Sequence, residues 1–172
     1  MLAYEGPLEV HYGQAYVFSG EADETGDMDA YFRGQSSGLL GAARPGMLFL
    51  TTGLHTGRVD FAVELAEAEP PLDESWEECV EASFVPSSED VQIVDWNGTL
   101  VVELPLSVKH YRVRYAGRAM DAGHEADTIP EGEDAIDAYR LSFWPAPPAP
   151  DQVLKQTSEI ARYWHDYARD LS

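Results

Sequence analysis

The sequence has little cysteine and lysine and no long apolar run. Its single cysteine, Cys79, excludes an internal disulfide and a cysteine-rich zinc site. No segment approaches the roughly 18 consecutive apolar residues that a membrane-spanning helix needs. Residues 1–9 also lack the basic and apolar regions of a signal peptide. We therefore expect a cytoplasmic protein that does not enter a membrane.

Positive charge is scarce in the first two thirds of the chain. The 172 residues include 31 Asp and Glu against 11 Lys and Arg, which gives a formal net charge of −20. Residues 1–105 hold 20 of the acids and only three of the bases, Arg33, Arg44 and Arg58. A field of this sign repels nucleic acids and acidic lipid surfaces and attracts basic proteins or cations. The charge therefore argues against direct nucleic-acid binding and favours a basic protein partner.

Motifs that would indicate a reaction are also missing. The glycine-rich stretch Tyr31–Gly46 lacks the lysine and the following helix of a phosphate-binding loop, and we interpret it as an irregular connection. No serine sits in a nucleophile elbow, and no histidine pair has the spacing of a zinc enzyme. The sequence thus predicts no catalytic residue and no cofactor.

One short segment offers a weak alternative. Asp121, His124 and Asp127 lie close together with Glu125, and carboxylates with an imidazole could coordinate a divalent cation. The acids do not alternate around a glycine as in a calcium loop, so a solvated loop is the plainer interpretation. We assign no metal ligand, but this segment supports an alternative function as a small-ligand- or metal-binding β-sandwich enzyme.

Alternating apolar and polar residues predict strands along most of the chain. Val59, Phe61, Val63 and Leu65 share one face, and the residues between them face the other way, which is the period of two of a half-buried strand. Similar patterns predict five more strands, at Leu8–Phe18, Met47–Thr52, Ser75–Val85, Val108–Tyr115 and Ala138–Trp144.

Turn residues and a change of period complete the expected fold. Asn97-Gly98 within Val91–Leu104 predicts a hairpin with a type I′ turn. Gly20–Asp29 and Ala119–Asp134 are expected to be loops. From residue 152 to 171 the apolar residues recur at helical spacing, with Asp151 as the expected N-cap.

Together these patterns predict a mainly β protein. About eight short strands without strand–helix alternation favour an antiparallel β-sandwich, and a closed barrel is the alternative. The sandwich is expected to form a single domain over residues 1–172, with one C-terminal amphipathic helix at 152–171 that packs on a sheet.

The densest group of acids predicts a surface for a basic protein. Like charges at this density repel one another, so such a face is either tolerated for solubility or favoured for a basic partner. We predict a partner-binding site formed by Asp73, Glu74, Glu77, Glu78 and Glu81.

Two regions resemble a known family. LEVHYGQAYVF at 8–18 is similar to the opening strand of the competence protein J (ComJ) family. LPLSVKHYRVRYAGRAMDAG at 104–123 and DAYRLSFWPAP at 137–147 are similar to the closing strands of that family. The chain departs from the family pattern by its glycine-rich insertion, its proline-rich segment and its C-terminal helix.

The resemblance implies a role without catalysis. The best-known members of the family are small acidic proteins that inhibit a DNA-degrading nuclease, and an acidic surface could occupy the phosphate-binding groove of such an enzyme. We therefore expect a non-catalytic acidic binding protein that inhibits a basic nuclease. The metal-assisted enzyme described above and a structural module that forms oligomers through its helix are the other hypotheses.

Overall fold

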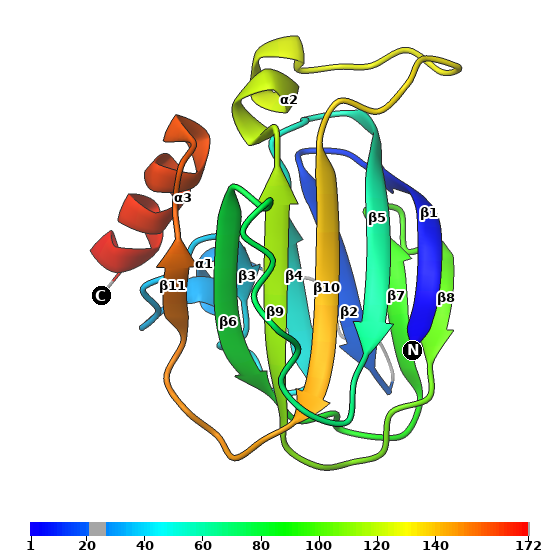
Figure 1. The fold of residues 1–172 in the computed structure, drawn as a ribbon, viewed down its shortest axis with the longest axis vertical. Coiled ribbons are helices and arrows are strands. Elements are labelled where there is room, and N and C mark those ends of the chain that lie inside the picture. Colours follow the sequence, from blue (N-terminus) through cyan, green and yellow to red (C-terminus); the bar gives the residue numbers. More distant parts are fainter. Residues whose placement is uncertain (21–26, 172) are drawn as a thin grey trace.

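Two β-sheets face each other across the core, and a helix lies at one side of them (Figure 1). The structure is a computed structural model that describes residues 1–20 and 27–171. Of the expected loop Gly20–Asp29, residues 21–26 therefore lie outside the described residues. The mainly β sandwich with a C-terminal helix is confirmed, and neither sheet closes into a barrel within the described ranges.

The described residues form eleven strands, more than the eight or so that the sequence predicts, and three helices. In chain order these elements are β1 (Leu2–Val10), β2 (Gln14–Ser19), α1 (Asp29–Phe32), β3 (Leu40–Gly41), β4 (Met47–Thr51), β5 (Gly57–Leu65), β6 (Glu78–Phe84), β7 (Val91–Asp95), β8 (Leu100–Leu104), β9 (Tyr111–Arg118), α2 (Met120–Ala126), β10 (Ala138–Pro145), β11 (Gln152–Lys155) and α3 (Glu159–Asp170).

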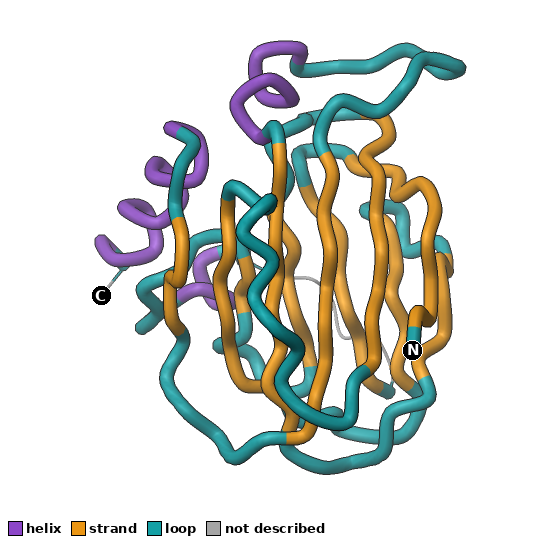
Figure 2. The backbone as a smooth tube through the Cα atoms, in the orientation of Figure 1, coloured by secondary structure: helices purple, strands orange, loops and turns teal. Residues whose placement is uncertain are grey.

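The larger sheet has the strand order β1-β5-β10-β9-β6-β11, and the smaller sheet has the order β3-β4-β2-β7-β8. Neighbouring strands are antiparallel except β5 and β10, which run parallel. The sandwich is therefore antiparallel as predicted, apart from this one pair. Strands β1 and β8, each the edge of its sheet, lie at the same side of the molecule, opposite β11 and α3 (Figures 1 and 2).

The alternation read from the sequence sets which side chains enter the core. On β5, Val59, Phe61 and Val63 are buried in the core cluster, whereas Asp60 is exposed on the outward face. The registers with β1 and β10 place Pro7 and Ala138 beside Asp60 on that same outward face. The period of two therefore predicted this strand and its two faces correctly.

The hairpin of β7 and β8 forms where Asn97-Gly98 predicts it, but with a different turn. A type I′ turn needs positive φ at both central residues. Only Gly98 has a positive φ, of 80°, and the Asp95 side chain organises the turn instead. Its Oδ1 accepts hydrogen bonds from the backbone N–H groups of Asn97 and Thr99, both at 2.9 Å.

The outward face of β9 carries two arginines but is not exposed to solvent. Arg112 and Arg114 point outward from the larger sheet and are nonetheless buried. Both bind the buried carboxylate of Glu81 on β6, with Nε of Arg114 2.9 Å from Oε2 and Nε of Arg112 3.2 Å from Oε1. Two guanidinium groups thus share one carboxylate on the outward face.

Backbone carbonyl groups from two covering segments accept from the other donors of these arginines, together with the side chains of Glu69 and Ser83. Arg114 donates to the carbonyl oxygen of Pro70 at 2.8 Å, and Arg112 donates to those of Ala149 and Pro150 at 3.0 and 2.9 Å. These carbonyls belong to the segment 66–77, which crosses the outward face in front of β9 (Figure 1), and to the proline-rich segment 146–150. The arginines therefore hold both segments against the sheet.

The expected helix at 152–171 is wrong in its first turns. Residues Gln152–Lys155 form β11, which pairs antiparallel with β6, and the helix begins only at Glu159. Ser158 is the N-cap and accepts a hydrogen bond from the N–H of Ala161 at 3.1 Å. Asp151 caps a different segment, because its Oδ2 accepts from the N–H groups of Ser36 and Ser37.

Helix α3 is attached to the sandwich by polar contacts as well as by packing. The N–H of Gly38 donates to Nδ1 of the buried His165 at 2.9 Å. A Cβ atom at Gly38 would lie 1.9 Å from the carbonyl oxygen of Trp164, so only glycine allows this approach. The glycine-rich stretch is irregular as expected, apart from the end of α1 and the short β3, but it is packed against α3.

We expect the shared carboxylate to be important for stability. Glu81→Gln keeps the shape of the side chain and removes the buried counter-charge that Arg112 and Arg114 share, which leaves Arg114 with only the exposed carboxylate of Glu69 at 3.2 Å. Loss of one partner from a buried ion pair should lower the free energy of unfolding by about 3 kcal/mol, measured by urea denaturation. Glu103→Gln, at an exposed position on β8, is the control and should change it by less than about 0.5 kcal/mol. Equal losses of stability in the two variants would contradict the structural role of Glu81.

The packing of His165 predicts a pH dependence. Burial lowers the pKa of His165 from 6.5 to about 4. As pH falls from 7 to 4.5 the unfolded chain takes up this proton before the folded protein does, so stability decreases. Wild type should lose about 2 kcal/mol more than His165→Asn, whose amide oxygen can still accept from Gly38 and does not titrate. Unfolding curves at both pH values test this, and parallel losses in the two proteins would contradict it.

Candidate functional site

The five acids of the predicted partner-binding site do not lie on one surface. Asp73 and Glu74 are exposed on the segment 66–77, and Glu77 is half-buried, with Oε1 2.6 Å from the N–H of Ala119. Glu78 is completely buried, and Glu81 is buried on the opposite face of β6 with its two arginines. Only Asp73, Glu74 and part of Glu77 can contact a partner.

The burial of Glu78 has a structural purpose. Its Oε1 accepts hydrogen bonds from the N–H groups of Thr157 and Ser158, at 2.6 and 3.1 Å, just before α3 begins. Burial raises the pKa of this carboxyl, and the backbone donors oppose the shift. Glu78 therefore binds the backbone at the start of α3 and is not part of a binding surface.

The segment with the weak metal candidates is a helix instead of the expected loop. Asp121 lies in the first turn of α2, and its two carboxylate oxygens accept from the N–H groups of Glu159 and Ile160 at 3.0 and 2.9 Å. His124 and Asp127 are exposed. Across residues 1–20 and 27–171, no three His, Cys, Asp or Glu side chains gather so that they could hold a metal ion.

Exposed acids do gather along the outward face of the larger sheet. Glu5 and Glu9 of β1 and Asp60 of β5 point outward and are exposed. Glu5 and Asp60 line a groove of about 450 Å³ together with Arg140 and with Trp76, which follows Asp73 and Glu74 on the segment 66–77. We call Asp73, Glu74, Asp60, Glu5 and Glu9 the acidic band.

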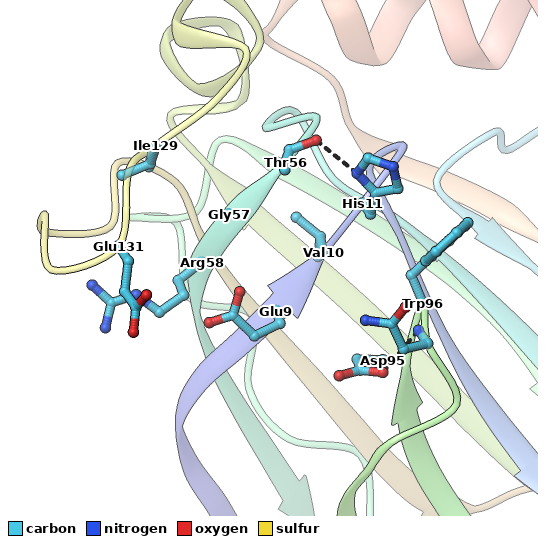
Figure 3. A pocket seen from close by; sticks show the side chains of 11 residues that line it. Glu9, Val10, His11, Thr56, Gly57, Arg58, Asp95, Trp96, Ile129 and Glu131 are labelled. Atoms are coloured by element: carbon cyan, nitrogen blue, oxygen red, sulfur yellow. Dashed lines mark hydrogen bonds between the residues drawn. The ribbon is translucent and has the colours of Figure 1, made fainter.

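A large hollow adjoins Glu9 at one end of this band. It has a volume of about 740 Å³ and lies between β1, the start of β5, the β7–β8 turn and the segment that follows α2 (Figure 3). Its charged side chains are the carboxylates Glu9, Asp95 and Glu131 and the guanidinium group of Arg58. The hollow therefore joins the edges of both sheets and carries net negative charge.

Aromatic rings form the rim next to the hollow. His11, Tyr12, His55 and Trp96 pack against one another, with ring centroids 4.2–5.6 Å apart. Tyr12 is 56% exposed and Trp96 is 40% exposed, and Tyr12 has a left-handed backbone with φ of 57°. A non-glycine residue in that conformation costs roughly 1–2 kcal/mol, yet the tight turn from β1 to β2 holds Tyr12 there.

One hydroxyl group links the two histidines of this rim. Oγ1 of Thr56 lies 2.9 Å from Nδ1 of His11 and 2.7 Å from Nδ1 of His55. Because the hydroxyl carries a single proton, at least one of the two rings must donate from its own Nδ1. Thr56 therefore fixes the orientation of both rings.

A buried polar group holds the loop that carries His55 and Thr56. Oδ2 of Asp137 accepts from the N–H of Leu54 at 3.0 Å and from the hydroxyl of Tyr139 at 2.5 Å. The hydroxyl of Tyr139 in turn accepts from the N–H of Gly53 at 2.7 Å. Burial raises the pKa of Asp137, and these donors oppose that shift. These hydrogen bonds therefore fix the backbone just before His55 and Thr56.

Sequence reasoning missed this end of the molecule, because its residues come from four separate segments with no motif. The only local signal was Trp96 beside Asn97-Gly98. A tryptophan next to a tight turn is poorly placed for the core, so it could have been noted as a candidate contact residue.

Cys79 carries no sign of reactivity. Its thiol is buried and free, and burial raises its pKa to about 11. Within the described ranges, no helix combines the length and apolar character needed to cross a bilayer.

Comparison with known proteins identifies structural relatives only. No family model and no curated protein matches the sequence. Among solved structures, the chain is similar to ComJ of Bacillus subtilis, described as the inhibitor of the DNA-degrading activity of NucA. The TM-score is 0.58 at 16% identity, over 85% of this chain and 98% of ComJ. It is also similar to the protein of crocagin biosynthetic gene J, with a TM-score of 0.54 at 14% identity over 86% and 98% of the two chains. The resemblance to ComJ seen in the sequence is thus confirmed at the level of the fold, and the chain has a ComJ-like β-sandwich.

Proposed function

We propose that this protein binds a basic, DNA-degrading nuclease and inhibits it. The observation that carries the proposal is the ComJ-like fold, which spans 98% of the nuclease inhibitor ComJ, in a chain with a net charge of −20. The role is that of a binding protein and requires no catalytic residue or cofactor of its own.

The physical basis is competition for cationic groups. A nuclease holds the DNA backbone with lysine and arginine side chains, which release counterions when they bind phosphate. A folded surface rich in carboxylates can pair with the same groups and thereby block access of DNA. Charge complementarity of this kind chiefly raises the association rate.

The acidic band is the proposed contact surface. It keeps Asp73 and Glu74 from the site predicted by sequence and adds Asp60, Glu5 and Glu9, which are exposed on the same outward face. Glu78 and Glu81 are excluded because their carboxylates are buried in internal contacts.

Inhibition can be measured directly with purified NucA of Bacillus subtilis. We expect the protein to slow degradation of double-stranded DNA when added in molar excess. Association with NucA, followed by surface plasmon resonance, should slow about tenfold or more between 50 and 300 mM salt, because the Debye length shortens. Undiminished DNA degradation at a hundredfold excess of the protein would overturn the proposal.

A charge-reversed variant tests the position of the contact surface. Glu5→Lys combined with Glu74→Lys places two positive charges in the acidic band and should slow association with NucA by about tenfold. Glu103→Lys combined with Glu125→Lys changes the net charge by the same amount at exposed positions on β8 and α2. If both double variants associate at the same rate, only the overall charge matters and the band is not the contact surface.

A further inference from the structure

We infer that the hollow beside Trp96 receives an arginine side chain of the basic partner. The inference rests on the proposed function and makes it more specific, because it assigns the end of the acidic band where a partner side chain is buried. It follows from four features of the hollow: its charge, the free oxygen of a buried carboxylate, its aromatic wall and its size.

The charge of the hollow favours a cation. Three carboxylates line it, those of Glu9, Asp95 and Glu131, against the single guanidinium of Arg58. That guanidinium already donates to the carbonyl oxygen of Glu133, 2.5 Å from its Nη2. A second guanidinium entering the hollow would therefore meet an excess of negative charge.

Asp95 provides the most specific contact. The residue is only 8% exposed, and its Oδ1 already binds the N–H groups of Asn97 and Thr99. Its Oδ2 accepts no hydrogen bond from any described residue and lines the hollow. This oxygen is not one of the buried atoms that lack a partner, so it is open to the hollow, where a cationic donor from outside would form a charge-assisted hydrogen bond with it.

Trp96 lies directly after Asp95 and forms an aromatic wall of the hollow. The residue is 40% exposed, and its indole packs against the rings of His11 and Tyr12, with centroids 4.7 and 5.6 Å away. A cation over an indole face is attracted by the ring quadrupole. Exposed tryptophan and tyrosine with rigid support are also the residues that dominate binding energy at protein interfaces.

Shape favours arginine over lysine. The planar guanidinium can stack on an indole and direct two N–H groups at a carboxylate at the same time, whereas an ammonium group is a point charge that holds its water more strongly. The volume of about 740 Å³ accommodates a long side chain with part of its backbone. Trp96 and Oδ2 of Asp95 together therefore match an arginine presented on a protein surface.

The first experiment uses NucA with variants of the hollow. Asp95→Asn keeps the oxygen that organises the turn and removes only the charge, and Trp96→Ala removes the wall. We expect each to raise the concentration for half-inhibition by about tenfold or more. Asp90→Asn is the matched control, since it makes the same chemical change just before the other end of β7, and it should inhibit as the wild type does.

The second experiment needs no nuclease. Nα-acetyl-arginine amide is titrated into the labelled protein, and the indole N–H signal of Trp96 is followed by NMR. We expect a saturable shift that Asp95→Asn reduces and Asp90→Asn does not. The neutral isostere Nα-acetyl-citrulline amide should cause little shift. Equal shifts from the two compounds would overturn the inference.

The two experiments separate the inference from the function on which it rests. Inhibition by the wild type together with unchanged inhibition by Asp95→Asn and Trp96→Ala overturns the arginine site and leaves the inhibitor role standing. Arginine-selective binding without inhibition of NucA overturns the inhibitor role and supports the site.

Discussion

The sharing of Glu81 by Arg112 and Arg114 is the interaction on which the outward face of this sandwich depends. Two guanidinium groups are buried on the side of a sheet that would normally face water, with one carboxylate between them. Their other donors bind backbone carbonyls of the segments 66–77 and 146–150 and the side chains of Glu69 and Ser83. The network therefore decides which part of the face is covered, and the acids of β1 and β5 remain exposed beside it.

Several acids of this chain have structural roles. Glu78, Asp121 and Asp151 each accept backbone N–H groups of distant segments, and Asp95 organises the hairpin turn. A carboxylate that accepts two N–H groups at a helix start or in a loop satisfies donors that would otherwise be buried without partners. A high density of acids in a sequence is thus a poor guide to a binding surface. Some of these carboxylates accept hydrogen bonds from backbone N–H groups that have no backbone acceptor.

The acids of the acidic band have a different arrangement from the group that the sequence favoured. They follow the outward face of the larger sheet from Asp73 to Glu9 and reach the hollow beside Trp96. The acidic band and the hollow at its end would act on different steps of binding to a basic protein. The first raises the rate of encounter with a basic protein, and the second holds one of its side chains.

The sequence by itself predicted most of the strands, the two faces of β5, the hairpin at Asn97-Gly98 and the overall β-sandwich, because the period of two and the turn residues are local properties. The single strand expected at Leu8–Phe18 is wrong, since it is divided between β1 and β2, which lie in different sheets. The sequence could not determine that Gln152–Lys155 is a strand or that 120–126 is helical, since both depend on contacts with distant segments. Nor could it separate Glu78 and Glu81 from Asp73 and Glu74. Only the tertiary structure decided which carboxylates face water and that His11, His55, Asp95 and Trp96 meet, because burial and proximity arise from segments that are far apart in the chain.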